Sequence, residues 1–189
     1  MLKKLISIII PILNEKENIK LLIKNIEDVF TSSLDKYNFE IIFIDDGSTD
    51  GSLEEITKYS KLSPKIRYLS FTKNFGKEIA MSAGLQYAQG NAAIILDADL
   101  QHPPALIPEF IKKWENGTDV VTGLRKNEKH TSPFRKITSY LSCSVLNSIS
   151  SYKPKRGETD FRLLSRNVID HFNRFTEKSR MTRSLINWL

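Results

Sequence analysis

The strongest constraint on the fold is a regular alternation of short apolar runs and longer amphipathic segments over the first two-thirds of the chain. Leu5–Ile12 is a continuous isoleucine-rich run, which is the pattern of a strand buried on both faces. Glu17–Phe30 then places its apolar residues at helical spacing. The pattern repeats with strands at Phe39–Ile44, Ile66–Phe71, Ala92–Leu96 and Val120–Val121, and with helices at Leu53–Tyr59, Gly76–Ala88 and Pro103–Trp114. We therefore predict an α/β fold with a mostly parallel central sheet covered by helices on both faces, and Gly90 is predicted to cap the third helix.

The last third of the chain has a different pattern. Ser132–Tyr152 is rich in serine, has apolar residues at near-helical spacing and contains the basic pair Arg135 and Lys136. This favours an amphipathic helix that lies on a membrane surface or packs on the sheet. Phe161–Leu164 predicts a short strand, and a final helix follows it. We divide the chain into a core of residues 1–125 and a second part of residues 126–189.

Composition limits the classes of partner. The 189 residues are 40% hydrophobic and 26% charged, as in globular domains, and the single cysteine, Cys143, fits a reducing compartment. The net charge of +6 fits an anionic lipid or a phosphate-rich substrate, and it equally fits a charge that serves only solubility; no basic run is long enough for a nucleic-acid arm, so we expect no nucleic acid. The apolar run Leu5–Leu13 is far shorter than the roughly 20 residues of a membrane-spanning helix, so we expect the chain as given to be cytoplasmic or to face the cytoplasm.

Polar clusters follow four of the predicted strands. These clusters are Pro11–Glu15, Asp45–Gly51, Lys73–Lys77 and Asp97–Gln101. Because ligands bind at the carboxyl ends of the strands in open α/β sheets, we expect all four clusters to meet at one functional rim.

Asp97 and Asp99 are the sharpest chemical signal in the sequence. Two carboxylates placed two residues apart after a buried strand can share one hard divalent cation, and Gln101 can supply a further oxygen. The alternative is a pair of solvated turn acids that cap the next helix. We favour the cation, Mg²⁺ or Mn²⁺, because a buried strand feeds directly into the pair and a second acidic cluster is expected nearby. His102 adjoins the pair and is interpreted as a turn residue.

The second acidic cluster fits two uses. Asp45 or Asp46 can accept hydrogen bonds from a base or ribose, and both also fit an Asx turn. The chain has no G-x-G-x-x-G or P-loop motif, so a bound diphosphate must be held by a metal and basic side chains. Arg125 can supply such a contact, and Arg135 and Ser139 share one predicted helix face that can hold a second phosphate. Each of these three also fits an ordinary surface residue.

These clusters, in this order, resemble the inverting family-2 glycosyltransferases with the GT-A fold. The residues that carry the resemblance are Ile10–Glu15, Asp45–Gly51, Asn74–Lys77, Asp97–Pro104 and Gly157–Arg166. The extended Asp97–Pro104 motif and the Asp160–Arg166 segment are most similar to the polyprenyl-phosphate branch, which includes dolichyl-phosphate mannose synthases and bacterial undecaprenyl-phosphate glucosyltransferases. Members of this branch often continue into C-terminal membrane helices, and this chain stops about where such helices would approach.

The resemblance implies roles for individual residues. Residues 1–125 would bind a nucleotide-sugar, with a uridine donor favoured by analogy, and residues 126–189 would bind a polyprenyl phosphate acceptor at the membrane surface. The residues implied to bind the donor are Pro11, Asn14, Glu15, Asp45, Asp46, Lys77, Asp97, Ala98 and Asp99. The cation would be held by Asp97, Asp99 and Gln101, the donor phosphates would contact Arg125, and the acceptor phosphate would be held by Arg135 and Ser139.

The implied reaction is sugar transfer to the lipid phosphate with inversion at the anomeric carbon. If the acceptor is instead a hydroxyl, Asp160 is the candidate catalytic base; otherwise it is expected to pair with Arg162 or Arg166. Two other functions stay open: a glycosyltransferase acting on a saccharide hydroxyl in cell-surface polysaccharide synthesis, and a non-catalytic nucleotide-sugar-binding scaffold. The Asp97, Asp99 and Gln101 set argues against the scaffold. A homo-oligomer also stays open.

Overall fold

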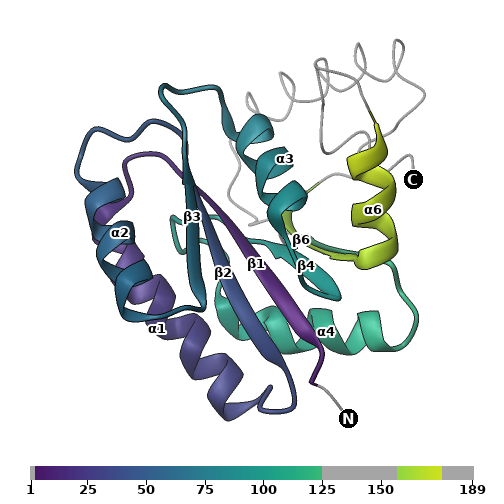
Figure 1. The fold of residues 1–189 in the computed structure, drawn as a ribbon. Helices are drawn as coiled ribbons and strands as arrows, with labels where there is room; N and C mark the ends of the chain where they lie inside the picture. Colours follow the sequence, from purple (N-terminus) through teal and green to yellow (C-terminus); the bar gives the residue numbers. More distant parts are fainter. Residues whose placement is uncertain (1–2, 125–156, 176–189) are drawn as a thin grey trace, which may run out of the picture.

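The computed structural model describes residues 3–124 and 157–175, which form a central sheet with helices on both faces (Figure 1). The strands are β1 (Leu5–Ile12), β2 (Asn38–Asp45), β3 (Ile66–Ser70), β4 (Ala92–Ile95), β5 (Val120–Leu124) and β6 (Glu158–Ser165). The helices are α1 (Lys16–Ser32), α2 (Ser52–Leu62), α3 (Lys77–Tyr87), the 3-10 turn η1 (Pro104–Leu106), α4 (Ile107–Glu115) and α6 (Arg166–Arg174). The predicted α/β fold is confirmed.

The described sheet has the strand order β3-β2-β1-β4-β6-β5. β1 pairs in parallel with β2 from Leu5↔Asn38 to Ile12↔Asp45, and it pairs in parallel with β4 on its other side. β6 is antiparallel to both β4 and β5, so the second part of the chain supplies a strand inside the sheet. The mostly parallel sheet is confirmed, and its antiparallel edge is a feature that the sequence patterns did not predict. The four parallel strands all end at one edge, which positions the site.

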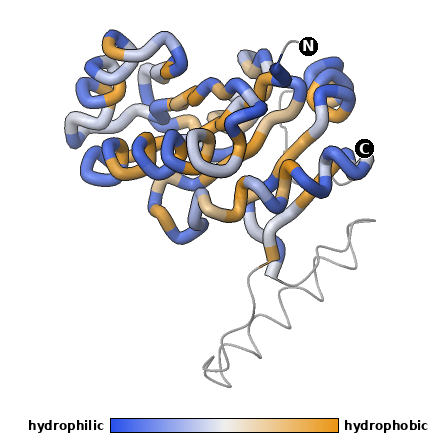
Figure 2. The backbone as a smooth tube through the Cα atoms, turned by 90° about the horizontal axis from the view of Figure 1, so that it is seen from below, coloured by the Kyte–Doolittle hydropathy of each residue, from blue (hydrophilic) through white to orange (hydrophobic). Residues whose placement is uncertain are grey.

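Alternating strand residues divide the core into two layers. Ile6, Ile8 and Ile10 of β1 pack with the apolar residues of α1, α2 and α4 on one face of the sheet. Ile9 of β1 and Ile42 of β2 pack with α3 and α6 on the other face. The hydropathy colouring in Figure 2 shows the apolar segments running through the interior, with hydrophilic segments outside. Burial on both faces explains why the strands are continuous apolar runs.

Gly90 has a different role from the one predicted. α3 ends at Tyr87 with Ala88 as its C-cap residue, so Gly90 does not cap the helix. A Cβ atom at Gly90 would lie 2.6 Å from the carbonyl oxygen of Ala92 and 2.7 Å from the amide nitrogen of Ser7. The Gly90 amide donates a hydrogen bond to Ser7 Oγ at 2.8 Å. The glycine is therefore needed for the close approach of this turn to β1.

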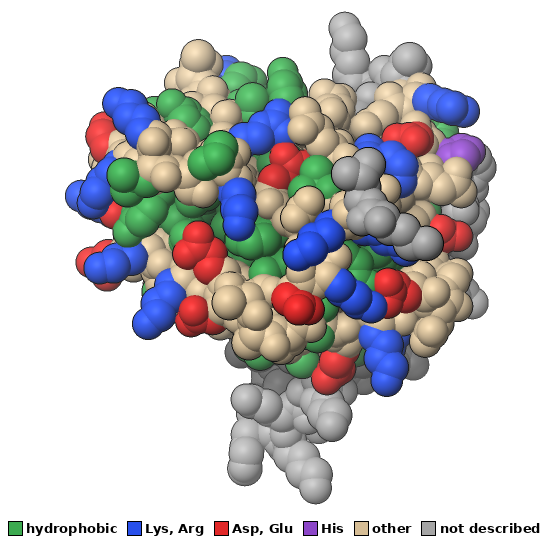
Figure 3. Space-filling model, turned by 60° about the horizontal axis from the view of Figure 1, so that its bottom comes forward, with side chains coloured by type: hydrophobic (Ala, Val, Ile, Leu, Met, Phe, Trp, Pro, Cys, Tyr) green, Lys and Arg blue, Asp and Glu red, His purple; other side chains and the backbone are tan. Residues whose placement is uncertain are grey.

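The side of the molecule that carries the N-terminus in Figure 1 comes forward in Figure 3, where acidic and basic side chains are interspersed. Lys36 pairs with Glu115 at 3.1 Å, and Lys4 lies 4.0 Å from the same carboxylate. Exposed pairs of this kind contribute only about 0–1 kcal/mol each. As far as the described residues go, this view shows no large surface of a single charge. None of the described helices has the length and apolar composition needed to cross a membrane.

Candidate active site

A pocket of about 330 Å³ opens at the carboxyl edge of the parallel strands. It is lined by Pro11, Ile12, Leu13, Glu15, Asp46, Asn74, Gly76, Lys77, Asp97, Ala98 and Asp99. These residues come from the segments that follow β1, β2, β3 and β4, so the structure brings the four polar clusters together. Seven of the nine residues expected to bind a donor line this pocket; Asn14 and Asp45 do not.

The loop after β4 has an unusual backbone conformation at Leu100. Its φ of 59° lies in the left-handed region, which costs roughly 1–2 kcal/mol for a residue with a Cβ atom. The Leu100 side chain packs against the larger core cluster, and this contact holds the turn in place. Within the turn the Gln101 amide donates to Asp99 Oδ1 at 3.0 Å. The packing of Leu100 and the hydrogen bond of the Gln101 amide therefore hold the loop that carries Asp97 and Asp99 in this conformation.

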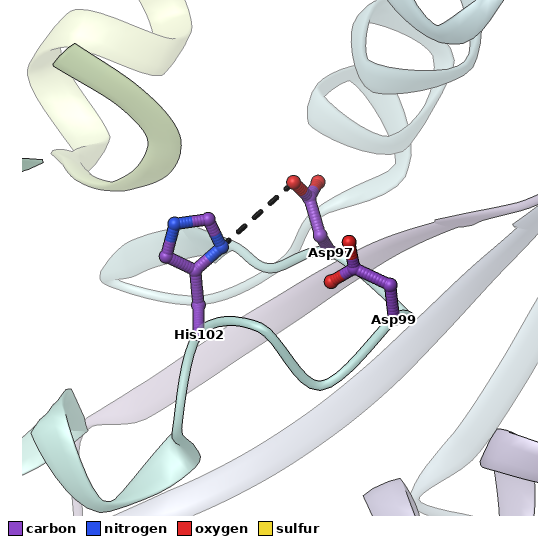
Figure 4. Close-up of side chains that lie close together, drawn as sticks. All are labelled: Asp97, Asp99 and His102. Carbon is purple, nitrogen blue, oxygen red and sulfur yellow. Dashed lines mark ion pairs between the residues drawn. The ribbon is translucent and has the colours of Figure 1, made fainter. Parts of the chain in front are cut away.

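The side chains of Asp97, Asp99 and His102 converge from this loop (Figure 4). One potential ligand atom from each lies within 4.8 Å of the others. His102 Nδ1 is 3.8 Å from Asp97 Oδ2, which is too long for a hydrogen bond. Both ring nitrogens of His102 are buried and have no hydrogen-bond partner among the described residues. Two carboxylates and an imidazole can together hold a divalent ion such as Mn²⁺.

Aromatic packing positions His102. Its ring lies 5.7 Å from the ring of Phe161 in β6, which is itself stacked on Phe110 of α4 at 4.4 Å. The interpretation of His102 as a turn residue missed its place beside the two carboxylates. The signal that could have revealed it is a histidine three residues after Asp99 in the same loop. Gln101, the predicted third ligand, lines a separate cavity of about 530 Å³ on the side of α4, β5 and β6.

Lys77 connects the loop after β4 to β6. Its ammonium nitrogen lies 2.6 Å from Asp97 Oδ1 and donates a hydrogen bond to Asp160 Oδ2 at 2.8 Å. Burial opposes the charge on Lys77, but the hydrogen bonds and charges of Asp160 and Asp97 outweigh it and raise the pKa of Lys77 above 10.5. The ammonium therefore stays protonated at neutral pH. Arg166, one expected partner of Asp160, donates to the carbonyl oxygens of Ala88 and Gly90.

The two adjacent acids after β2 have different surroundings. Asp45 is 1% exposed and accepts hydrogen bonds from the Ser48 amide at 3.1 Å and from Ser70 Oγ at 2.9 Å. Asp46 lines the pocket and accepts from the amides of Phe75 at 2.7 Å and Gly76 at 2.9 Å. Asp45 thus ties β2 to β3, while Asp46 fixes the start of α3 at the pocket wall.

Asn14 joins two loops behind the pocket. Its backbone has a positive φ of 57°, its amide donates to Ser48 Oγ at 3.0 Å, and its Oδ1 accepts from the Thr49 amide at 2.8 Å. The neighbouring Glu15 lines the pocket, and its amide donates to Ser52 Oγ at 3.0 Å. These bonds hold the segments after β1 and β2 together, so Asn14 shapes the pocket from outside its wall.

Three predicted residues, Arg125, Arg135 and Ser139, lie outside the described residues. β5 ends at Leu124, and β6 begins at Glu158. The described residues therefore include the pocket expected to bind the donor and Asp160, and they do not include the residues expected to bind the acceptor phosphate.

Comparison with protein families matches residues 7–178 to the family described as Glycosyl transferase family 2. The chain belongs to this family. It is 40% identical over 185 residues to the putative glycosyltransferase CsbB of Bacillus subtilis, covering 98% of this chain and 55% of the relative. It is 35% identical over 184 residues to a bactoprenol glucosyl transferase of Shigella phage SfV, covering 97% of this chain and 59% of the relative. The chain thus spans little more than half the length of these relatives.

Solved structures share the fold. A mannosyltransferase from Pyrobaculum calidifontis, in complex with GDP-Man and Mn²⁺, matches with a TM-score of 0.60 and 19% identity over 90% of this chain and 47% of its own. Glucosyl-3-phosphoglycerate synthase from Mycobacterium tuberculosis, in complex with Mn²⁺, UDP and glucosyl-3-phosphoglycerate, matches with a TM-score of 0.60 and 20% identity over 87% of this chain and 58% of its own. These matches confirm the predicted glycosyltransferase fold.

Proposed function

We propose that this chain is the catalytic part of an enzyme that transfers a sugar from a nucleoside diphosphate sugar to a polyprenyl phosphate, with inversion, at the cytoplasmic face of a membrane. The observation that carries the proposal is the group formed by Asp97, Asp99 and His102 beside the pocket at the rim of the parallel strands. The relative named bactoprenol glucosyl transferase, which matches 97% of this chain, supports the class of acceptor.

The pocket offers a suitable surface for the donor. Pro11, Ile12 and Leu13 provide an apolar wall for a base, and Glu15 and Asp46 add polar groups for the nucleoside. Uridine is the proposed base. The diphosphate carries negative charge and needs cations around it, because this chain has no glycine-rich phosphate loop. Lys77, in the same pocket wall, is the described side chain that meets this need, and Arg125 is proposed to add a second contact.

The residues present fit a divalent metal. Two carboxylates suit both Mg²⁺ and Mn²⁺, whereas the imidazole of His102 favours Mn²⁺. We propose Asp97, Asp99 and His102 as ligands. Gln101, the third ligand expected from the sequence, lies in the same loop and lines the neighbouring cavity. When bound, the ion would stabilise the negative charge that develops on the departing nucleoside diphosphate.

The state of Asp160 favours a phosphate acceptor over a hydroxyl. A hydroxyl needs a general base, but Asp160 is only 8% exposed and its carboxylate is bound by the Lys77 ammonium, which weakens it as a base. A phosphate monoester has a second pKa of about 6, so it is already a dianion at neutral pH and needs no base. Arg135 and Ser139 are proposed to orient that phosphate, with residues 126–189 forming the acceptor side.

The test is an acceptor comparison with the full-length protein in membranes. UDP-glucose, UDP-N-acetylglucosamine and GDP-mannose are each supplied with Mn²⁺ and either undecaprenyl phosphate or a saccharide acceptor. We expect one donor to label the lipid, and Arg135→Ala to lose transfer while donor binding is kept. Transfer to the saccharide alone would contradict the proposed acceptor, and donor binding without any transfer would favour the scaffold.

A further inference from the structure

Lys77 occupies an unusual position between two carboxylates of the site. The amine donates a well-formed hydrogen bond to Asp160. Asp97 Oδ1 lies still closer, at 2.6 Å, so the ammonium nitrogen bridges the two carboxylates. Lys77 thus forms an ion pair with each of the two carboxylates.

A divalent ion and the Lys77 ammonium need the same carboxylate. Asp97 is a proposed metal ligand, and its Oδ1 already lies against a positive charge. An ion bound by Asp97 and Asp99 would repel an ammonium held at that distance, because two cations in a partly buried site are weakly screened. Lys77 must then lose its contact with Asp97, while its hydrogen bond to Asp160 keeps the amine at the pocket wall.

A nucleoside diphosphate offers the displaced amine a new partner. Lys77 lines the same pocket as Asp97 and Asp99, which is the pocket that the donor is proposed to fill. The side chain is 42% exposed, which leaves it free to turn toward the pocket. Ion pairing with phosphate would replace the ion pair lost at Asp97.

We propose that Lys77 is an internal cation that neutralises Asp97 in the empty site, and that it passes from Asp97 to the donor diphosphate when metal and donor bind. This inference rests on the donor and metal site of the proposed function. It makes the binding of the metal and of the nucleotide cooperative, because each removes an obstacle to the other. Lys77 thereby discourages a metal from occupying the site before the donor arrives.

The test measures Mn²⁺ binding to the full-length protein by electron paramagnetic resonance of free Mn²⁺, with and without UDP. Lys77→Met is expected to bind Mn²⁺ roughly tenfold more tightly than wild type without UDP, since one opposing charge is removed. UDP is expected to strengthen Mn²⁺ binding to wild type and to have a much smaller effect on the variant. Lys77→Arg, which keeps the charge, is expected to behave as wild type.

Lys73→Met is the matched control for loss of charge. Lys73 precedes the same helix, packs over the Phe75 ring at 5.2 Å and makes no ion pair within the described residues. Its removal is expected to change Mn²⁺ affinity by less than about twofold, because the charge is exposed and screened. Thermal unfolding of each variant checks that the fold is kept.

The outcomes separate the two proposals. Unchanged or weaker Mn²⁺ binding by folded Lys77→Met without UDP would overturn the role of Lys77, while normal Mn²⁺ and UDP binding by wild type would leave the proposed function intact. An equal effect of UDP on both proteins would also overturn it. Failure of wild type and Lys77→Met to bind Mn²⁺ even with UDP would overturn both the metal site and the inference.

Discussion

The loops after β2 and β4 look alike in sequence, since each places two acids at the end of a buried strand, but they differ in what satisfies those acids. After β2, the carboxylates of Asp45 and Asp46 each accept two hydrogen bonds from neutral protein donors. After β4, Asp97 is approached by Lys77 and His102, and within the described residues Asp99 accepts a single amide hydrogen bond. Protein donors satisfy the carboxylates of the loop after β2, whereas the loop after β4 has carboxylate oxygens that can bind a cation.

The acids of the two loops therefore differ in how much they contribute to stability and to function, although both loops lie at the same edge of the sheet. Carboxylates saturated by amides and hydroxyls hold loops in place, and their loss leaves buried donors unpaired. Carboxylates gathered with few donors repel one another and gain most from a bound cation. Substitution of Asp45 should therefore reduce stability, and substitution of Asp97 should reduce activity with little effect on stability.

The largest expected effect is that of Asp97→Asn on sugar transfer. The amide keeps the shape of the side chain but removes the charge that would hold the cation, so we expect the transfer rate to fall by at least about 100-fold. The free energy of unfolding should change by less than about 1 kcal/mol, because Lys77 keeps its ion pair with Asp160. Rate assays and urea unfolding on the same preparation check both numbers. A large loss of stability would remove the contrast with the loop after β2.

Asp45→Ala should produce the opposite result. It leaves the Ser48 amide and Ser70 Oγ without their acceptor, so we expect the free energy of unfolding to fall by about 2–3 kcal/mol. Mn²⁺ affinity of the folded protein should stay within about twofold of wild type. Asp45→Asn, which keeps one acceptor oxygen, is the control, and it should lower the free energy of unfolding by less than Asp45→Ala does. Weaker Mn²⁺ binding with unchanged stability would assign Asp45 to the metal site.

His102→Ala tests whether the loop after β4 holds its cation with an imidazole. We expect Mn²⁺ affinity to fall roughly tenfold and Mg²⁺ affinity to fall less, because Mg²⁺ prefers oxygen ligands. Competition titrations of the two metals measure the ratio directly. His102→Gln, which replaces the ring nitrogen with an oxygen ligand, should restore Mg²⁺ binding more than Mn²⁺ binding. Equal losses for both metals would indicate that His102 only supports the loop.

The smallest expected effect is that of Ser70→Ala. This change removes one of the two hydrogen bonds to Asp45 and should lower the free energy of unfolding by about 1 kcal/mol. Donor and metal binding should be unchanged, because Ser70 does not line the pocket. Denaturant unfolding and calorimetry on the same sample make the comparison. A change in donor binding would mean that the tie between β2 and β3 also shapes the site.

Most of the fold follows from local patterns. Strands buried on both faces read as apolar runs, and crossover helices show helical spacing, so the strands from β1 to β4 could be predicted with their connecting helices. The position of β6 between β4 and β5 could not, because strand order depends on long-range pairing that no local pattern encodes. The role of Gly90 was missed for a similar reason, since its neighbour Ser7 is distant in sequence.

The site shows the same limit on a smaller scale. The rule of strand ends predicted which loops meet, and the structure brings those loops together around one pocket. It could not distinguish Asp45 from Asp46, because adjacent residues face different neighbours and only the fold decides which one lines the pocket. The ion pair of Lys77 with Asp160 joins residues on α3 and β6, and His102 depends on a ring from β6 for its position. These contacts arise from packing and not from spacing.

The central claim, that the loop after β4 forms a metal-dependent donor site, is tested most directly by calorimetry. UDP-glucose, UDP-N-acetylglucosamine and GDP-mannose are titrated into wild type and Asp99→Asn, each with and without Mn²⁺. The asparagine can still accept the Gln101 amide hydrogen bond, so the loop should keep its shape. We predict that one donor binds wild type only when Mn²⁺ is present and does not bind the variant. Equal donor binding by both proteins, with or without Mn²⁺, would contradict the account.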